Sequence, residues 1–216
     1  MTEAKRQVQS LEVWMASIPQ PGAVYGEQWG KVTEGHMAAV FQHLCDHLAY
    51  KPQNVVEIGS GGGRWSREIA KRLTPDANLT LVDGTDAARS ELERVCGRPF
   101  DLLVSPCGNL PEIPDSSVDL VFSFDTFVHF DELLFNAYTQ EITRILKPGA
   151  RLMLHYAEKW DHPNIVLDPT NCFKPPHWFS REPMVDRYQL DAYGMHLPIL
   201  AGYGSVFWSK RKNPIP

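Results

Sequence analysis

The stretch VVEIGSGGGRW, residues 55–65, constrains the fold of this 216-residue chain more than any other segment. A short apolar run ends at Glu57, and glycines follow at positions 59, 61 and 63. Glycine lets the backbone turn sharply and lets a ligand approach the main chain closely. The pattern therefore predicts a buried strand, a tight turn and a helix, the unit at which open α/β sheets bind nucleotides. A dinucleotide fingerprint would place another glycine where this chain has Arg64, which disfavours a nicotinamide cofactor.

Strand-like and helix-like patterns alternate along the chain from residue 53. Apolar runs predict strands at residues 55–58, 79–83, 102–105, 118–124 and 151–156, and helical spacing occurs at residues 64–73, 87–96 and 131–145. Lys147-Pro148-Gly149 is expected to form a turn before the fifth strand, because proline fixes φ and glycine allows positive φ. Such alternation predicts right-handed crossovers and an α/β fold with a mainly parallel sheet.

Four segments resemble, in order and spacing, the motifs of class I S-adenosylmethionine-dependent methyltransferases. They are Glu57-x-Gly59-x-Gly61-x-Gly63, LTLVDG at residues 79–84, LPEIPDSSVDLVFSFDTFVHF at residues 110–130 and ILKPGARLMLHY at residues 145–156. The resemblance covers roughly residues 50–157. It implies S-adenosyl-L-methionine as cofactor and a doubly wound, mainly parallel seven-stranded sheet with an antiparallel last strand and helices on both faces.

The remaining segments are expected to cover this sheet within a single domain of residues 1–216. Helical patterning at residues 4–17 and 33–49, with a loop rich in proline, glycine and aromatic residues between them, predicts an N-terminal helical cover at residues 1–50. Residues 51–157 are then the cofactor-binding half. Residues 158–216 hold a substrate-side insertion and the final strands, which we expect at residues 195–200 and 206–209. A loop as long as residues 157–193 is usually functional in a compact domain.

The resemblance implies a cofactor site at the carboxyl ends of the first four strands. Glu57 is expected to meet the cofactor's ammonium group, and Asp83 to accept the ribose hydroxyls. The family often places an acid after the third strand to bind the adenine amino group, and this chain has none there. The expected cofactor-binding residues are Glu57, Gly59, Ser60, Gly61, Gly63, Asp83, Gly84, Cys107, Gly108, Asn109 and Asp125.

Three residues are candidates for the chemistry: His129, His155 and Asp125. Asp125 and His129 follow the fourth predicted strand and His155 ends the fifth, so all three are expected at the edge where the methyl group emerges. An imidazole titrates near neutral pH and can take a proton from a hydroxyl acceptor. Alternatively, the histidines only support the cofactor, and an amine or thioether acceptor needs alignment alone. We expect no metal, because too few carboxylates and amides gather there for a divalent ion.

Composition argues against several kinds of partner. The formal net charge of −5 and the pI near 5.9 give no electrostatic attraction toward nucleic acid or anionic lipid. The place after the fourth strand reads Phe124-Asp125-Thr126-Phe127 and not the Asn/Asp-Pro-Pro-Tyr type of motif usual in enzymes that methylate bases. No apolar run reaches the ~18 residues of a membrane helix. The N-terminus is polar and lacks the apolar core of a signal peptide, and the four cysteines form no Cys-x-x-Cys pair. We therefore expect a cytoplasmic protein.

We therefore expect methyl transfer from S-adenosyl-L-methionine to an oxygen or nitrogen atom of a small molecule. Three alternatives stay open: a peptide or protein acceptor, a thioether sulfur as the acceptor atom, and a non-catalytic partner subunit that binds the cofactor. The oligomeric state stays open as well.

Overall fold

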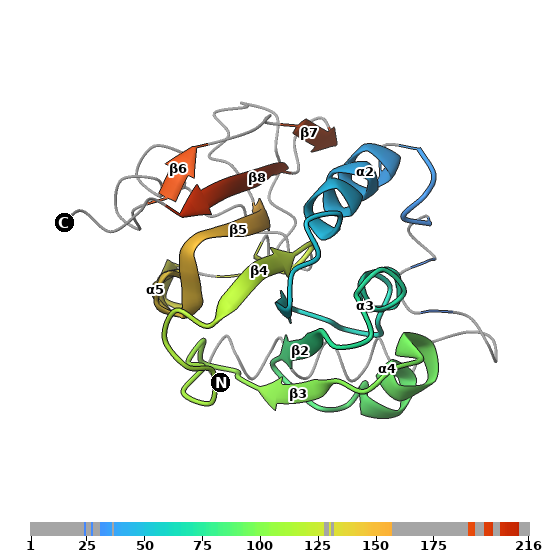
Figure 1. Cartoon of the computed structure of the whole chain (residues 1–216), viewed down its shortest axis with the longest axis horizontal. Helices are drawn as coiled ribbons and strands as arrows, with labels where there is room; N and C mark the ends of the chain where they lie inside the picture. Colours follow the sequence, from blue (N-terminus) through green and yellow to red (C-terminus); the bar gives the residue numbers. More distant parts are fainter. Residues whose placement is uncertain are drawn as a thin grey trace, which may run out of the picture.

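The computed structural model describes residues 24, 27, 31–35, 37–127, 130, 132–156, 190–192, 197–200 and 204–211 (Figure 1). The expected helix at residues 4–17, most of the long insertion and His129 lie outside these described residues.

Eight strands of the described residues form one sheet in the order β3-β2-β1-β4-β5-β8-β6, with β7 paired to β8 (Figure 1). The strands are β1 Asn54–Ile58, β2 Asn78–Asp83, β3 Asp101–Val104, β4 Val118–Ser123, β5 Leu146–Tyr156, β6 Leu190–Ala192, β7 Leu197–Leu200 and β8 Gly204–Arg211. Strands β1 to β5 pair in parallel, which confirms the predicted α/β class and parallel central sheet. β8 pairs antiparallel with β5, and the count of eight differs from the expected seven.

The central strands are buried on both faces. In β1 and β4 nearly every residue is buried, as is typical of parallel strands that helices cover on both sides. The described helices are α2 Met37–Leu48, α3 Ser66–Ala70, α4 Arg89–Cys96 and α5 Glu132–Ile145. Helices α2, α3 and α4 pack on one face, and α5 packs on the other (Figure 1).

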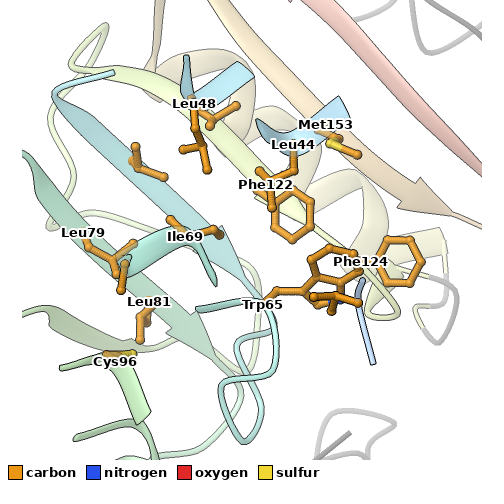
Figure 2. Packing of buried hydrophobic residues seen from close by; sticks show 14 of the residues in the cluster. Leu44, Leu48, Trp65, Ile69, Leu79, Leu81, Cys96, Phe122, Phe124 and Met153 are labelled. Carbon is orange, nitrogen blue, oxygen red and sulfur yellow. The ribbon is translucent and has the colours of Figure 1, made fainter. Parts of the chain in front are cut away.

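The face under α2, α3 and α4 holds an apolar cluster that reaches the carboxyl ends of the strands (Figure 2). In α2 the apolar residues recur every three or four positions, so one side of the helix is buried. Trp65 packs against the end of β4, with its ring centre 5.3 Å from that of Phe122 and 4.9 Å from that of Phe124. The cluster includes Leu44, Leu48, Trp65, Ile69, Leu79, Leu81, Cys96, Phe122, Phe124 and Met153.

The other face is filled mainly by α5. Its apolar positions recur at helical spacing and meet the opposite side chains of β1 and β4, with Phe127 and Phe130 closing the cluster near the strand ends. The residues of α5 in this cluster are Phe135, Tyr138, Ile142 and Ile145.

The turn predicted at Lys147-Pro148-Gly149 is wrong: these residues belong to β5 as a bulge. Helix α5 ends at Ile145 and β5 begins at the next residue. Val118 pairs with Leu146 and Leu120 with Arg151, so a two-residue step on β4 lies opposite a five-residue step on β5. Gly149 has φ +79°, which suits glycine, and proline has no N–H to donate to the neighbouring strand.

Candidate cofactor and active site

The glycine turn between β1 and α3 lies at the carboxyl end of the central strands. The Gly59 N–H donates to the Val82 carbonyl at 2.7 Å, which holds the turn against the end of β2. Gly59 has φ +79°, and a Cβ there would lie 1.9 Å from the Thr126 side-chain oxygen. Gly61 has φ +48°, but a Cβ there would meet no described heavy atom within 4 Å. The protein therefore packs tightly against Gly59 and leaves open space beside Gly61.

Asp83 ends β2 and accepts hydrogen bonds from this turn. The Gly61 N–H donates to Oδ2 at 2.8 Å, and the Gly84 N–H donates to Oδ1 at 2.7 Å. Burial raises the pKa of Asp83, while the backbone N–H groups of Gly61, Gly84 and Thr85 act in the opposite direction. A carboxylate has about four lone-pair sites, so each oxygen keeps the capacity to accept a hydroxyl.

Glu57 lies within β1 and is 2 % exposed. Its Oε2 atom has no hydrogen-bonding partner among the described residues. Burial raises the pKa of Glu57 from its ordinary value of 4.5 to about 8; the Ser66 hydroxyl lowers it and the charge of Asp83 adds to the rise. A buried carboxylate without a cation is costly, so a positively charged group beside Glu57 would be stabilising.

The turn after β3 presents the predicted residues Cys107, Gly108 and Asn109. Ser105 holds this turn, because its hydroxyl donates to the Asn109 carbonyl at 2.7 Å and its own carbonyl accepts from the Tyr138 hydroxyl at 2.5 Å. Gly108 is buried against α5, whereas Cys107 and Asn109 are exposed. Contact with a ligand from this turn would therefore come from residues 107 and 109.

Asp125 and His155 lie in direct contact at the ends of β4 and β5. Asp125 Oδ1 lies 3.1 Å from His155 Nδ1, and the Asp125 N–H donates to the same nitrogen at 3.1 Å. The His155 side chain is 6 % exposed and stacks on Phe124, with ring centres 4.4 Å apart. The structure thus brings together two of the three predicted catalytic residues; the third, His129, is outside the described residues.

Sequence reasoning missed the place of Arg64. This residue is buried, its guanidinium lies 5.7 Å from the Trp65 ring centre, and its Nη2 atom lies 4.0 Å from Asp125 Oδ2. Burial lowers the pKa of Arg64, while the charges of Asp125 and Glu27 raise it. The only signal in the sequence was the position of Arg64 directly after the glycines, and that position does not predict that its side chain is buried.

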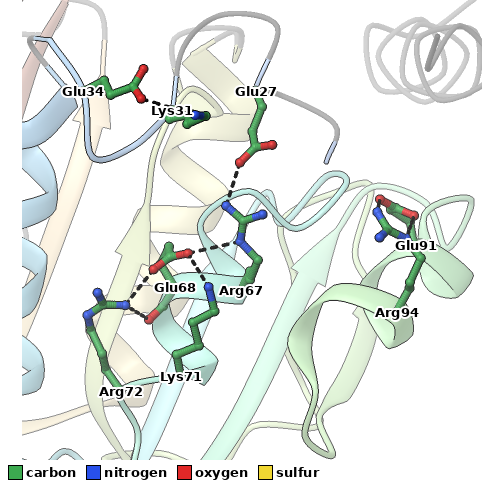
Figure 3. Close-up of polar contacts among 9 residues, drawn as sticks. All are labelled: Glu27, Lys31, Glu34, Arg67, Glu68, Lys71, Arg72, Glu91 and Arg94. Carbon is green, nitrogen blue, oxygen red and sulfur yellow. Dashed lines mark hydrogen bonds and ion pairs between the residues drawn. The ribbon is translucent and has the colours of Figure 1, made fainter. Parts of the chain in front are cut away.

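Glu27 is bonded to the start of helix α3 (Figure 3). It accepts from Arg67 at 2.6 Å, and Arg67 also donates to Glu68 at 3.1 Å. Lys71 and Arg72 donate to the same Glu68 carboxylate at 2.9 and 2.8 Å. The start of helix α3 is therefore tied both to Glu27 and to Lys71 and Arg72, which follow the last residue of the helix.

We compared the chain with known protein families to see which of them it resembles. Residues 55–149 match a family model described as a methyltransferase domain. These residues are thus similar to a methyltransferase domain, which supports the resemblance of the sequence motifs to class I S-adenosylmethionine-dependent methyltransferases. A curated relative, the probable chloroplastic tocopherol O-methyltransferase of Oryza sativa subsp. japonica, is 26 % identical over 159 residues, or 69 % of this chain and 40 % of the relative. The chain spans less than half the length of the curated relatives it matches.

Solved structures of methyltransferases share the fold. The N-methyltransferase NodS from Bradyrhizobium japonicum WM9, in complex with S-adenosyl-L-homocysteine, has a TM-score of 0.68 at 14 % identity and covers 96 % of this chain and 98 % of its own. The 1,6-didemethyltoxoflavin-N1-methyltransferase of Burkholderia thailandensis has a TM-score of 0.65 at 14 % identity and covers 99 % and 92 %. At such identities the likeness concerns the fold.

The residues at these strand ends fit the expected cofactor. The oxygen of Glu57 that lacks a partner suits an ammonium, the open space beside Gly61 suits a ligand close to the backbone, and Asp83 suits a pair of hydroxyls. The Ser60 hydroxyl is also buried without a partner among the described residues, so a further polar contact is possible there. In the part of the chain that the structure describes, no group of three His, Cys, Asp or Glu residues could hold a metal. No described helix is long and apolar enough to cross a membrane.

Proposed function

We propose that this chain is an enzyme that transfers the methyl group of S-adenosyl-L-methionine to an oxygen or nitrogen atom of a small molecule. The observation that carries the proposal is the contact between Thr126 and Gly59, in which Thr126 Oγ1 lies 3.4 Å from the Gly59 carbonyl oxygen. This contact joins the glycine turn to the segment that holds Asp125 and its partner His155. An acid–imidazole pair thus accompanies the turn that suits the cofactor, and an imidazole there could take the proton of a hydroxyl acceptor.

The proposed mechanism divides the work among the residues of this chain. When bound, S-adenosyl-L-methionine supplies a methyl carbon that its sulfonium makes electrophilic. Glu57 balances a positive charge, Asp83 accepts two hydroxyls, and the backbone at Gly61 allows close approach. His155 accepts the proton of a hydroxyl acceptor as the acceptor oxygen attacks. Alignment of the reacting atoms and exclusion of water supply most of the rate.

Calorimetric titration tests the choice of cofactor. The full chain should bind S-adenosyl-L-methionine and S-adenosyl-L-homocysteine, and it should give no heat with NAD. Binding of NAD with no response to either sulfur nucleoside would overturn the proposal.

A transfer assay tests the acceptor and the base. With cofactor labelled in its methyl group, label should enter the small-molecule fraction of a metabolite extract, and His155→Ala should lower kcat by ~10²–10⁴-fold at nearly unchanged cofactor affinity. His129→Ala is tested beside it, and His47→Ala in α2 is the control that should leave kcat unchanged. Near-normal kcat in both the His129 and His155 variants would mean that alignment alone suffices.

The names of the relatives support this class of acceptor. The rice relative is named as an O-methyltransferase of tocopherol, and the two structural neighbours are named as N-methyltransferases. Label in the protein fraction would favour the peptide acceptor, and label on a thioether would favour sulfur. Cofactor binding without transfer to any pool would favour a non-catalytic partner subunit.

Three finer features belong to the same proposal. The strands on the continuous path from β3 to β6 would be the family's seven, with β8 as the antiparallel one. Residues 51–157 would form the cofactor-binding half, and residues 1–50 and 158–216 would cover the acceptor. The free thiols of Cys45, Cys96 and Cys107 suit a cytoplasmic setting.

A further inference from the structure

The groups that suit the cofactor follow the order of the strands in the sheet. Glu57 is on β1 and Asp83 ends β2, and β3 is the next strand in that direction. Asp83 pairs with Val104 in the parallel register, and the Ser105 N–H donates to the Asp83 carbonyl at 2.8 Å. A nucleoside whose ribose meets Asp83 and whose amino-acid end meets Glu57 therefore extends its base toward β3. The turn at residues 105–110 is the segment that such a base would contact.

Helix α5 holds this turn in place. The Tyr138 hydroxyl donates to the Ser105 carbonyl at 2.5 Å, and the Ser105 hydroxyl donates to the Asn109 carbonyl at 2.7 Å. Gly108 has φ +81°, and a Cβ there would lie 2.9 Å from the Cβ of Ala137 in α5. Hydrogen bonds and close packing within the protein thus fix the backbone of the turn.

The acid that contacts this turn from α5 is already paired. The carboxylate of Glu141 accepts the Leu110 N–H at 2.9 Å and two bonds from Arg144, at 3.0 and 2.7 Å. The bonds from Arg144 lower the pKa of Glu141, and the Leu110 N–H adds to this effect against that of burial. Residues 105–111, SPCGNLP, contain no acid of their own. Neither the turn nor Glu141 therefore offers a carboxylate to the base.

The polar side chains that the turn exposes can both donate and accept a hydrogen bond. Cys107 and Asn109 are exposed, whereas Gly108 is buried. A thiol donates and accepts weakly, and an amide presents either its oxygen or its nitrogen according to its rotation. A carboxylate only accepts, so it would bind a 6-amino group of a purine and repel a 6-oxo group. Because Cys107 and Asn109 contact water, neither is left unpaired in a buried space when the amino group is missing.

We propose that this site does not select the 6-amino group of the cofactor's purine and binds the 6-oxo form, an inosine, nearly as well as the adenosine form. The inference rests on the proposed function, in which the chain binds S-adenosyl-L-methionine. Selection of the cofactor then depends on Glu57 at the amino-acid end and on Asp83 at the ribose.

Calorimetry with two demethylated cofactors tests the proposal on the full chain. S-adenosyl-L-homocysteine carries an amino group at position 6 of the purine, and S-inosyl-L-homocysteine carries an oxo group there. One neutral hydrogen bond changes affinity by about tenfold or less, so the two Kd values should lie within about tenfold of each other. A larger preference for the adenosine compound would overturn the proposal alone. Binding of neither compound would refute the proposed function and this inference with it.

Variants that place a carboxylate on the turn supply the contrast. In Cys107→Asp and Asn109→Asp the new group only accepts, so at least one of them should prefer S-adenosyl-L-homocysteine by more than about tenfold. Cys107→Asn is the matched control, since asparagine has the shape of aspartate without its charge, and its two Kd values should stay within about tenfold. An unchanged ratio of Kd values in both aspartate variants would overturn the proposal, because the turn would then not face the base.

Discussion

Replacing Glu57 by glutamine should make the cofactor-free protein more stable, although Glu57 is central to the proposed cofactor site. The carboxylate is buried, and one of its oxygens has no partner among the described residues. Glutamine keeps the shape of the side chain and cannot ionise, so it removes the penalty of a buried charge.

The size of the effect follows from the pKa of Glu57, which burial raises from 4.5 to about 8. The folded protein binds this proton more tightly than the unfolded chain does. The favourable contribution of Glu57 to folding is therefore complete below the lower pKa and is lost as the pH rises to the higher one. At about 1.4 kcal/mol per pH unit, the free energy of unfolding of Glu57→Gln should exceed that of wild type by less than ~1 kcal/mol near pH 5 and by roughly 3 kcal/mol near pH 7.

Urea unfolding of both proteins across this pH range measures the difference. Glu68→Gln is the matched control, because Glu68 is also buried in the same region. Burial raises the pKa of Glu68, but its bonds to Lys71, Arg72 and Arg67 outweigh burial and lower the pKa overall. The ionised form of Glu68 therefore stabilises the fold, and Glu68→Gln should be destabilising at neutral pH.

Two results would refute this reasoning about Glu57. One is a difference between wild type and Glu57→Gln that does not change with pH, since the two curves run parallel only if Glu57 has the same pKa in the folded and the unfolded state. The other is a destabilised Glu57→Gln at pH 7. Although Glu57→Gln should be more stable without cofactor, it should bind S-adenosyl-L-methionine more weakly than wild type in calorimetry, because the cofactor's ammonium group loses its charged partner.

The remaining predictions concern binding, packing and the N-terminal segment. Asp83→Ala should weaken cofactor binding by ~1.5–3 kcal/mol in calorimetry, as for a charge-assisted hydrogen bond; affinity within twofold of wild type would contradict the ribose role. Gly59→Ala should lower the melting temperature more than Gly61→Ala, since both positions have positive φ but only a Cβ at Gly59 clashes; equal melting temperatures would contradict this. Glu27→Gln should lower the free energy of unfolding in urea by ~1 kcal/mol or less, whereas the control Glu34→Gln, in an exposed ion pair, should leave it unchanged; equal losses in the two variants would contradict a stabilising role for the pair between Glu27 and Arg67.

The sequence predicted the central fold well because the signals are local. Apolar runs that end in polar residues locate β1, β2 and β4 within a residue or two of their bounds. The segment Lys147-Pro148-Gly149 misled the prediction because a turn and a bulge both use proline and a glycine with positive φ. Only the register between β4 and β5, which depends on residues about thirty positions apart in the sequence, distinguishes the two.

The candidate site shows the same difference between features set by local sequence and features set by distant residues. Asp83 and the glycines could be found because their motif lies within one βαβ unit. The proximity of Asp125 to His155 followed from topology, since adjacent parallel strands end at the same edge. The hydrogen bond from the Asp125 N–H to His155 Nδ1 could not be predicted, because it needs a left-handed residue outside any turn motif. The burial of Arg64 depends likewise on packing across strands.

The carboxylates of this sheet divide according to the edge at which they lie. Asp119, near the amino end of β4, accepts from Lys147 at 2.7 Å and from the backbone N–H groups of Gln53 and Asn54 at 3.0 and 2.9 Å. Burial raises its pKa, but these bonds outweigh burial and lower the pKa overall. At the carboxyl edge the opposite holds: the pKa values of Glu57 and Asp83 are raised, and Asp125 adopts a strained φ. A ligand that brings a cation to Glu57 and hydroxyls to Asp83 would stabilise these carboxylates, which supports the proposed cofactor site at the carboxyl edge.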